Sequence, residues 1–250
     1  MKLLAEFQSL IKAVSVWAYS LLIVCLIIFS LPVSMGKTPA QIVIDRFQSD
    51  FLSSEIQLVV LAPTEAFAAQ AGISLLLAFL ITLPLLIIRV YGYVFPALRP
   101  AERRALARAG VTSGLLFLAG AVFGYIMVAP ITLKVLYAFA GPLNVRQLLS
   151  LSGFIGFITG SIFISGLIFQ IPVSMFLLTK IGLVQPSRWR QHWRTAVLGF
   201  LIFTALITPD GSGVTMLLLA GPLIGLYLLG TFFAGRTSKA ITHQISLHPD

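Results

Sequence analysis

Charge is scarce in this sequence. Lysine, arginine, aspartate and glutamate together make up 10% of the 250 residues, whereas hydrophobic residues make up 58%. A soluble domain carries about 25% charged residues. A chain of this composition cannot cover its own surface with groups that water solvates, and we therefore expect lipid to cover part of it.

Residues that commonly perform catalysis or bind metals are also few. One cysteine excludes a disulfide framework and argues against a cysteine-based metal site. The histidines, His192, His243 and His248, lie outside the apolar runs, so a Ser/His pair within a membrane span has no histidine to use. HExxH, a glycine-rich phosphate loop and paired carboxylates within an apolar run are all missing from the sequence. We therefore predict no enzyme, no cofactor and no metal.

Long runs without charge are what the sequence has in abundance. A helix needs about 20 apolar residues to cross a membrane. Six runs follow one another: Ala13–Gly36, Ala66–Ile88, Ala109–Leu133, Gln147–Thr179, Thr195–Pro209 and Gly211–Gly235. The fifth has only 15 residues, and a polar glycine-rich start shortens the sixth. Continuous apolar runs favour helices over a β-barrel. We predict an all-α membrane protein with six spans in one domain, residues 1–236, and a short tail, residues 237–250.

The first run could instead be a cleaved signal peptide. It spans 24 residues, which is longer than an ordinary signal-peptide core, and Lys37 follows it in place of a small-residue cleavage site. We therefore interpret it as a retained first helix.

The basic residues predict the orientation. With the N-terminus inside, twelve lysines and arginines fall in inside segments and four fall outside, and Arg89 within the second run can extend towards the inside. This bias predicts cytoplasmic N- and C-termini in a cell membrane. The net charge of +9 is then explained by the basic residues that orient the chain in the membrane. Nucleic-acid binding is the alternative interpretation of this positive charge, but the basic residues are divided among short segments that flank the spans.

The only long connection, from about Lys37 to Glu65, lies outside in this orientation. Half of the acidic residues of the chain fall in it. Apolar residues between Gln41 and Leu52 have the spacing of a short amphipathic helix lying on the membrane. A hydrophobic piece, Ile56–Ala62, follows. We expect a cap over the outer face, with a loosely ordered loop as the alternative.

Polar, proline and glycine residues within the runs mark helix contacts and interruptions. Gln170 can hydrogen-bond another helix, either in a partner or within its own bundle. Prolines at four positions predict kinks or local unwinding: Pro84, Pro130, Pro172 and Pro222. Three pairs of glycines four residues apart permit close helix approach: Gly120 and Gly124, Gly156 and Gly160, and Gly221 and Gly225.

The residues alone therefore indicate a membrane scaffold that binds other proteins. Two other classes stay open. A small-molecule transporter predicts a polar cavity at mid-membrane and an internal repeat, and the two three-span halves do not match convincingly. A membrane-embedded enzyme predicts ionisable residues clustered in one leaflet, and the sequence shows no such cluster.

Short motifs in a fixed order add a family resemblance, which covers residues from about 60 to 236. They are residues 62–67 (APTEAF), 91–98 (YGYVFPAL), 99–104 (RPAERR), 117–125 (FLAGAVFGY), 166–172 (GLIFQIP), 180–184 (KIGLV), 207–210 (ITPD) and 220–223 (AGPL). In this order and spacing the chain resembles the TatC family, the core subunit of the twin-arginine protein translocase. Short fifth and sixth helices are a further similarity.

The resemblance implies a receptor for twin-arginine signal peptides of folded cargo, formed at the cytoplasmic face by the N-terminal segment and the first inside loop. Glu102 matches the glutamate that pairs with a signal arginine, because a carboxylate can accept a bidentate guanidinium. Neutralisation of Glu102 by its neighbours is the structural alternative. The implied signal-peptide residues are Glu6, Gln8, Tyr93, Phe95, Pro96, Glu102, Arg103 and Arg104.

The resemblance also implies partners: single-span TatA- and TatB-like subunits, further copies of the chain, and transport driven by the proton-motive force. The residues implied at partner contacts are Gln170, Pro172, Thr208, Pro209 and Asp210. Two positions depart from the family pattern. Gln8 stands where an arginine is usual, and Gln170 stands where a glutamate is usual, so Gln170 can hydrogen-bond but cannot ionise. We expect signal recognition to depend more heavily on Glu102 as a result.

The short fifth span carries a further expectation. From Thr195 to about Thr208 a helix is about 21 Å long at 1.5 Å per residue, whereas the hydrocarbon core is about 30 Å thick. A helix this short thins the surrounding bilayer or recruits partners. We therefore expect partner helices to assemble beside it.

Overall fold

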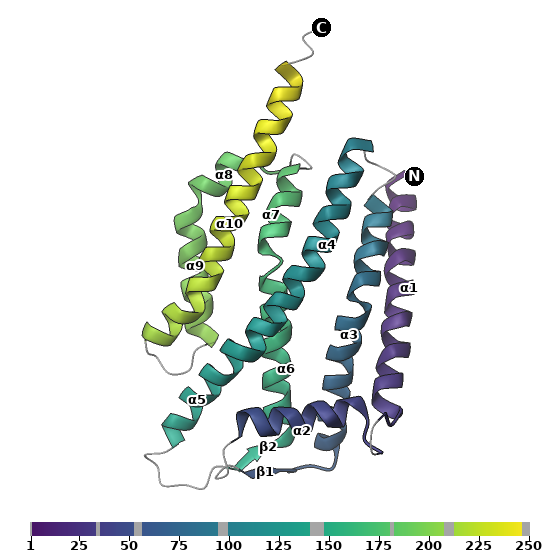
Figure 1. Ribbon diagram of the computed structural model, residues 1–250, viewed down its shortest axis with the longest axis vertical. Coiled ribbons are helices and arrows are strands. Elements are labelled where there is room, and N and C mark those ends of the chain that lie inside the picture. The colour runs from purple at the N-terminus through teal and green to yellow at the C-terminus, as the bar shows by residue number, and fades with distance from the viewer. Residues whose placement is uncertain are drawn as a thin grey trace.

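The computed structural model describes residues 2–33, 36–52, 57–94, 100–140, 148–180, 183–207 and 213–246. Towards several helix ends, including residues 2–14 and 101–109, only the backbone is described. Most described residues are helical (Figure 1).

Long helices run side by side along the molecule. They are α1 (Lys2–Ser30), α3 (Thr64–Val94), α4 (Pro100–Phe123), α5 (Ala129–Ala140), α6 (Leu151–Ile168), α7 (Ile171–Lys180), α9 (Trp193–Ile207) and α10 (Gly213–Ser246). Three stretches are long and apolar enough to cross a membrane: Thr64–Leu86, Gly110–Tyr137 and Leu151–Lys180. Shorter apolar helices cover Ser15–Ser30, Trp193–Ala205 and Leu219–Gly235. Each of the six charge-free runs therefore contains an apolar helix.

The last two helices differ from each other in length. α9 has 15 residues, as its short apolar run predicted. α10 has 34 residues, so the prediction of a short sixth helix is wrong for the helix itself. Its apolar part ends at Gly235, and the helix continues through polar residues to Ser246. The helix is longer than its apolar part because the polar residues after Gly235 include no helix-breaking proline before residue 247.

Two of the four prolines coincide with interruptions in the helices. A π-helical turn, η2 (Gly124–Val128), lies just before Pro130, and two residues separate the end of α6 from the start of α7, next to Pro172. Proline has no N–H to donate and crowds the carbonyl four residues earlier, so the helix must adjust there. By contrast, α3 continues through Pro84, and α10 continues through Pro222.

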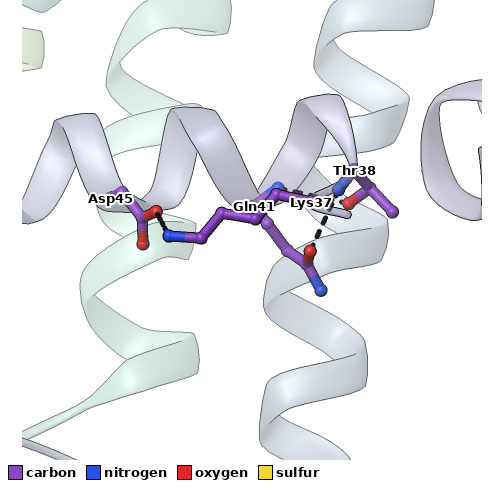
Figure 2. A network of polar contacts seen from close by, with 4 residues as sticks. All are labelled: Lys37, Thr38, Gln41 and Asp45. Carbon is purple, nitrogen blue, oxygen red and sulfur yellow. Dashed lines mark hydrogen bonds and ion pairs between the residues drawn. The ribbon is translucent and has the colours of Figure 1, made fainter. Parts of the chain in front are cut away.

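At the end opposite the N-terminus, the helix α2 (Pro39–Phe51) lies across the ends of the long helices (Figure 1). The helix predicted over Gln41–Leu52 is thus present, although it starts earlier. Thr38 and Gln41 form a capping box: Thr38 Oγ1 accepts from the Gln41 N–H at 3.3 Å, and Gln41 Oε1 accepts from the Thr38 N–H at 3.0 Å (Figure 2). Lys37 pairs with Asp45 along the same helix at 2.6 Å. Pro39 at the first position suits the helix start.

A short parallel pair of strands lies at the same end as α2. β1 (Gln57–Val59) and β2 (Leu148–Ser150) pair with Leu58 opposite Leu149. β1 falls within the hydrophobic piece noted in the sequence. Ser150 Oγ donates to Glu65 Oε1 at 2.9 Å, so the first turn of α3 is tied to the start of α6. The end of the molecule that carries α2 is thereby built from segments that are about ninety residues apart in the chain.

The core is packed where α3, α4 and α6 meet. The rings of Phe79, Phe117 and Phe163 contact one another with centroids 5.1 to 6.2 Å apart. Gly120 and Gly124 lie directly against α6: a Cβ on Gly120 would be 2.6 Å from the Ser165 carbonyl oxygen. The close approach predicted for this pair is therefore confirmed.

The other two glycine pairs behave differently. A Cβ on Gly156 or Gly160 would meet nothing within 4 Å, and the same holds for Gly221 and Gly225. The prediction of close approach is wrong for these pairs within the chain. Spacing alone cannot say which face of a helix meets a neighbour.

Candidate functional site

The implied signal-peptide surface gathers at one end of the molecule. The start of α1, the end of α3 and the start of α4 all lie at the end that carries the N-terminus (Figure 1). α1 packs along α3, and α3 packs against α4. The fold therefore brings the start of α1 to the same end as the end of α3 and the start of α4, which follow about ninety residues later in the sequence.

The backbone positions of the implied residues agree with this arrangement. Glu6 and Gln8 lie in the first turns of α1, and Tyr93 is the residue before the last of α3. Glu102 is the third residue of α4, and Arg103 and Arg104 follow it. A carboxylate in the first turn of a helix is favoured by the partial positive charge of the helix N-terminus. Phe95 and Pro96 lie outside the described residues, in the five-residue connection between α3 and α4.

Gln170 lies in the break between α6 and α7, and its amide is bonded within the chain. Ser113 Oγ of α4 donates to Gln170 Oε1 at 2.5 Å, and Gln170 Nε2 donates to the Ser113 carbonyl oxygen at 3.1 Å. The hydroxyl and the backbone carbonyl of Ser113 thus bond the oxygen and the nitrogen of the Gln170 amide, respectively. The pair fixes α4 to the point where the α6–α7 helix is interrupted.

Pro172 is buried in the contact between α7 and α10. A Cβ on Gly230 of α10 would lie 3.1 Å from the Pro172 Cα and 2.6 Å from Met175 Sδ. Gly230 therefore lets α7 approach α10 closely. Pro172 and Gln170 consequently both hold neighbouring helices of the same chain in place.

An apolar groove of about 240 Å³ lies where α9 and α10 diverge from α6. Gly156 and Gly160 of α6 line one wall, which explains why their Cα atoms face open space. Phe203 of α9 and Leu219 and Leu223 of α10 line the opposite wall. Thr208, Pro209 and Asp210, which follow α9, lie outside the described residues.

Sequence reasoning missed a cluster that joins α2 to the π-helical turn. Tyr125 Oη donates to Asp50, whose Oδ2 lies 3.1 Å from Arg46 Nε. The rings of Phe47 and Phe51 pack on Tyr125, with centroids 5.6 and 5.1 Å away. The available signal was that Phe47 and Phe51 repeat every four residues on a helix that also carries Arg46 and Asp50 at the same spacing.

No group of three or more histidine, cysteine, aspartate or glutamate side chains in the described ranges could hold a metal ion. What these ranges contain is a bundle of apolar helices, an end where the start of α1 meets the end of α3 and the start of α4, and an apolar groove between helices. Such a fold defines a helical membrane protein. The chain belongs to the TatC family, described as Sec-independent protein translocase protein (TatC), whose sequence profile matches residues 3–222. It is therefore a component of a protein translocase and not an enzyme.

Relatives in three groups of organisms share the match. The chain is 35% identical over 211 residues to the Sec-independent protein translocase protein TatC of Cenarchaeum symbiosum, covering 84% of this chain and 80% of the relative. It is 28% identical to the TatC protein of Listeria innocua, covering 90% of this chain and 91% of the relative. It is 34% identical to the chloroplastic protein of Arabidopsis thaliana, covering 74% of this chain and 54% of the relative.

Solved structures show the same fold. A crystal structure of the twin arginine translocase receptor TatC superposes with a TM-score of 0.75 at 27% identity, over 93% of this chain and 99% of that one. A second crystal structure of the receptor, in DDM, gives a TM-score of 0.76 at 27% identity, over 92% of this chain and 99% of that one.

Proposed function

We propose that this chain is the receptor and scaffold subunit of a twin-arginine translocase, which binds twin-arginine signal peptides of folded cargo at its cytoplasmic face. The observation that carries the proposal is the convergence of the α1 start, the α3 end and the α4 start at one end of the molecule (Figure 1). Transport would draw on the proton-motive force, as in the family.

The proposed orientation has six spans, cytoplasmic termini and α2 as an outer cap in a cell membrane. Both termini lie at the same end of the molecule, which an even number of spans requires (Figure 1). The excess of twelve basic residues over four supports that end being inside. α2 buries Phe47 towards the bundle at the opposite end, as a helix lying on the outer surface would.

Recognition would rest on Glu102. A carboxylate at the N-terminal turn of α4 can accept two parallel N–H bonds from a guanidinium, a geometry that a lysine cannot reproduce. Arg103 and Arg104 would bias the peptide's approach, and Glu6 and Gln8 on α1 would border the same face. Tyr93, Phe95 and Pro96 would contact the apolar part of the signal peptide.

Assembly with single-span TatA- and TatB-like subunits and with further copies of the chain would use the side of α9. α9 has 15 residues, about 22 Å of helix, which is short of a hydrocarbon core of about 30 Å. The apolar groove borders this helix. Ser113 already bonds both the oxygen and the nitrogen of the Gln170 amide. A partner helix near Gln170 and Pro172 would therefore contact the groove residues beside them. It would also contact Thr208, Pro209 and Asp210.

The test is capture of a twin-arginine signal peptide by the purified chain, comparing Glu102→Gln with the unchanged protein. Loss of a charge-assisted bidentate bond should weaken binding about tenfold or more. Asp45→Asn is the matched control, because it makes the same acid-to-amide change in an exposed ion pair at the opposite end. A twin-lysine peptide should bind weakly to the unchanged protein.

The two substitutions separate the proposal from a general charge effect. Equal capture by the unchanged protein and by Glu102→Gln would exclude Glu102 as the recognition residue. Equal capture of twin-arginine and twin-lysine peptides by the unchanged protein would overturn the proposed receptor function.

A further inference from the structure

Three arginines lie within seven residues on α8 (Pro186–Gln191) and the start of α9. Arg188, Arg190 and Arg194 are all exposed. The sequence has no aspartate or glutamate between Glu102 and Asp210. Among the described residues, ion pairs join Lys37 to Asp45 and Arg46 to Asp50, at the other end of the molecule. The three guanidinium groups, which we call the α8–α9 arginine surface, therefore have no ion-pair partner within the part of the chain that the structure describes.

The backbone that carries this surface is fixed to two other helices. Trp189 Nε1 donates to Thr179 Oγ1 of α7 at 3.0 Å. Tyr227 Oη of α10 donates to the Trp189 carbonyl oxygen at 2.8 Å. Because α8 is tied to α7 and α10, the spacing of the arginines on either side of Trp189 is set before any ligand arrives.

The Arg190 side chain packs against α10 at Gly235. A Cβ on Gly235 would lie 3.0 Å from Arg190 Nη2, so the guanidinium occupies space that a glycine leaves open. Its position beside α10 agrees with the attachment of α8 through Tyr227. The Arg190 guanidinium therefore lies against α10 while its side chain stays exposed.

An exposed apolar track runs from the arginine surface down α9. Arg194, Leu198 and Ile202 are four residues apart, so they share one face of the helix. Leu198 is 58% exposed and Ile202 is 55% exposed. Trp193, which is 45% exposed, lies beside Arg194, with 5.6 Å between the guanidinium carbon and the ring centroid. Tryptophan favours the level of lipid headgroups.

We propose that the α8–α9 arginine surface binds the headgroup of an anionic phospholipid of the inner leaflet, such as phosphatidylglycerol, with an acyl chain lying along Leu198 and Ile202. Guanidinium groups match phosphate oxygens, and basic pockets between helices on the cytoplasmic side suit such headgroups. A twin-arginine signal peptide is cationic and is repelled here. An acidic protein segment has the required charge, but it has no acyl chain to cover the apolar track. The inference rests on the proposed orientation, which places α8 at the inner surface.

Tryptophan fluorescence can measure this headgroup preference. The full chain carrying Trp17→Phe retains Trp189 and Trp193 beside the surface. It is reconstituted in phosphatidylcholine bilayers that contain equal fractions of either dibrominated phosphatidylglycerol or dibrominated phosphatidylcholine. Quenching by the anionic bromolipid should exceed that by the neutral one. Each arginine replaced by glutamine should lower the relative affinity for phosphatidylglycerol about fivefold at low salt.

Matched variants separate a local site from net charge. Arg188→Gln, Arg190→Gln and Arg194→Gln combined should abolish most of the preference. The control combines Lys37→Gln, Arg89→Gln and Lys134→Gln, which removes the same charge elsewhere and should leave the preference unchanged.

Two results would overturn the inference. One is equal quenching of the Trp17→Phe protein by the two bromolipids, which needs no arginine variant. The other is an unchanged preference in the triple arginine variant when circular dichroism shows normal helicity. Raised salt should reduce the preference in the Trp17→Phe protein. No signal peptide takes part in these measurements, so their failure leaves the Glu102 test intact.

Discussion

Gly120 and Gly156 share a spacing motif but differ in their surroundings. A Cβ on Gly120 would approach the Ser165 carbonyl oxygen to 2.6 Å and the Phe169 Cβ to 2.8 Å, whereas a Cβ on Gly156 would meet nothing within 4 Å. The backbone of α6 cannot move aside as the end of a flexible side chain can. The same one-carbon addition should therefore separate α4 from α6 at one position and leave the other undisturbed.

Gly120→Ala should lower the free energy of unfolding by roughly 1–3 kcal/mol, because the two helices must move apart. Gly156→Ala, the matched control, should leave this free energy unchanged or raise it slightly, since alanine favours helix over glycine. Thermal unfolding of the purified variants in detergent compares the two. Equal effects of the two substitutions would contradict the packing described between α4 and α6.

Single residues also show where sequence reasoning reaches its limit. Gln170 stood out because it is a lone amide in an apolar run, but its partner Ser113 is 57 residues away and looks like any other small polar residue. Periodicity reports the faces of one helix and cannot identify which distant helix meets them. The Tyr125–Asp50 contact was unpredictable for the same reason, because it joins residues 75 positions apart.

At the scale of elements, apolar runs located the helices well and their ends less well. α2 begins at Pro39, two residues before the predicted helix, because the capping box of Thr38 and Gln41 extends the start. α10 continues past its apolar part to Ser246. Hydropathy detects burial in lipid or protein, whereas helix ends depend on local hydrogen bonds and on proline. The β1–β2 pair joins two three-residue segments, too short for any pattern to reveal.

α9 is the element whose length can be tested directly. Inserting four leucines between Leu198 and Gly199 adds about 6 Å and slightly more than one turn, so the faces of the helix nearly keep their directions. Its length then comes close to the hydrocarbon thickness of about 30 Å. Assembly with single-span partner subunits should fall if mismatch at α9 recruits them, and co-purification of the partners measures this.

The control for the insertion keeps the length and changes the composition. Ala196, Val197 and Ala205 are replaced by leucine, which raises apolar content without adding a turn. Partner assembly should persist in this variant. Unchanged assembly and export after the insertion would show that the short α9 is not the feature that partners recognise.

For the whole molecule, the direction of the chain through the bilayer decides what every face can do. The same end carries the N-terminus, the start of α4 with Glu102, and the α8–α9 arginine surface, and the opposite end carries α2 and the strand pair (Figure 1). Charge distribution in the sequence predicts which end is inside, whereas the fold adds that both termini lie at one end, which suits an even number of spans. The tertiary structure is needed to know which segments share an end, because that depends on how the helices pack.

Side-specific labelling tests this orientation. Single cysteines are introduced into a Cys25→Ala background at Asp45 or Val60, which are exposed at the end with α2, and at Ser187 or Gln191, which are exposed on α8. A membrane-impermeant maleimide added to intact cells should label the cysteines at 45 and 60 and spare those at 187 and 191. All four should react after the membrane is permeabilised. Labelling of positions 187 and 191 in intact cells would place Glu102 on the outer side, where it could not receive signal peptides from the cytoplasm.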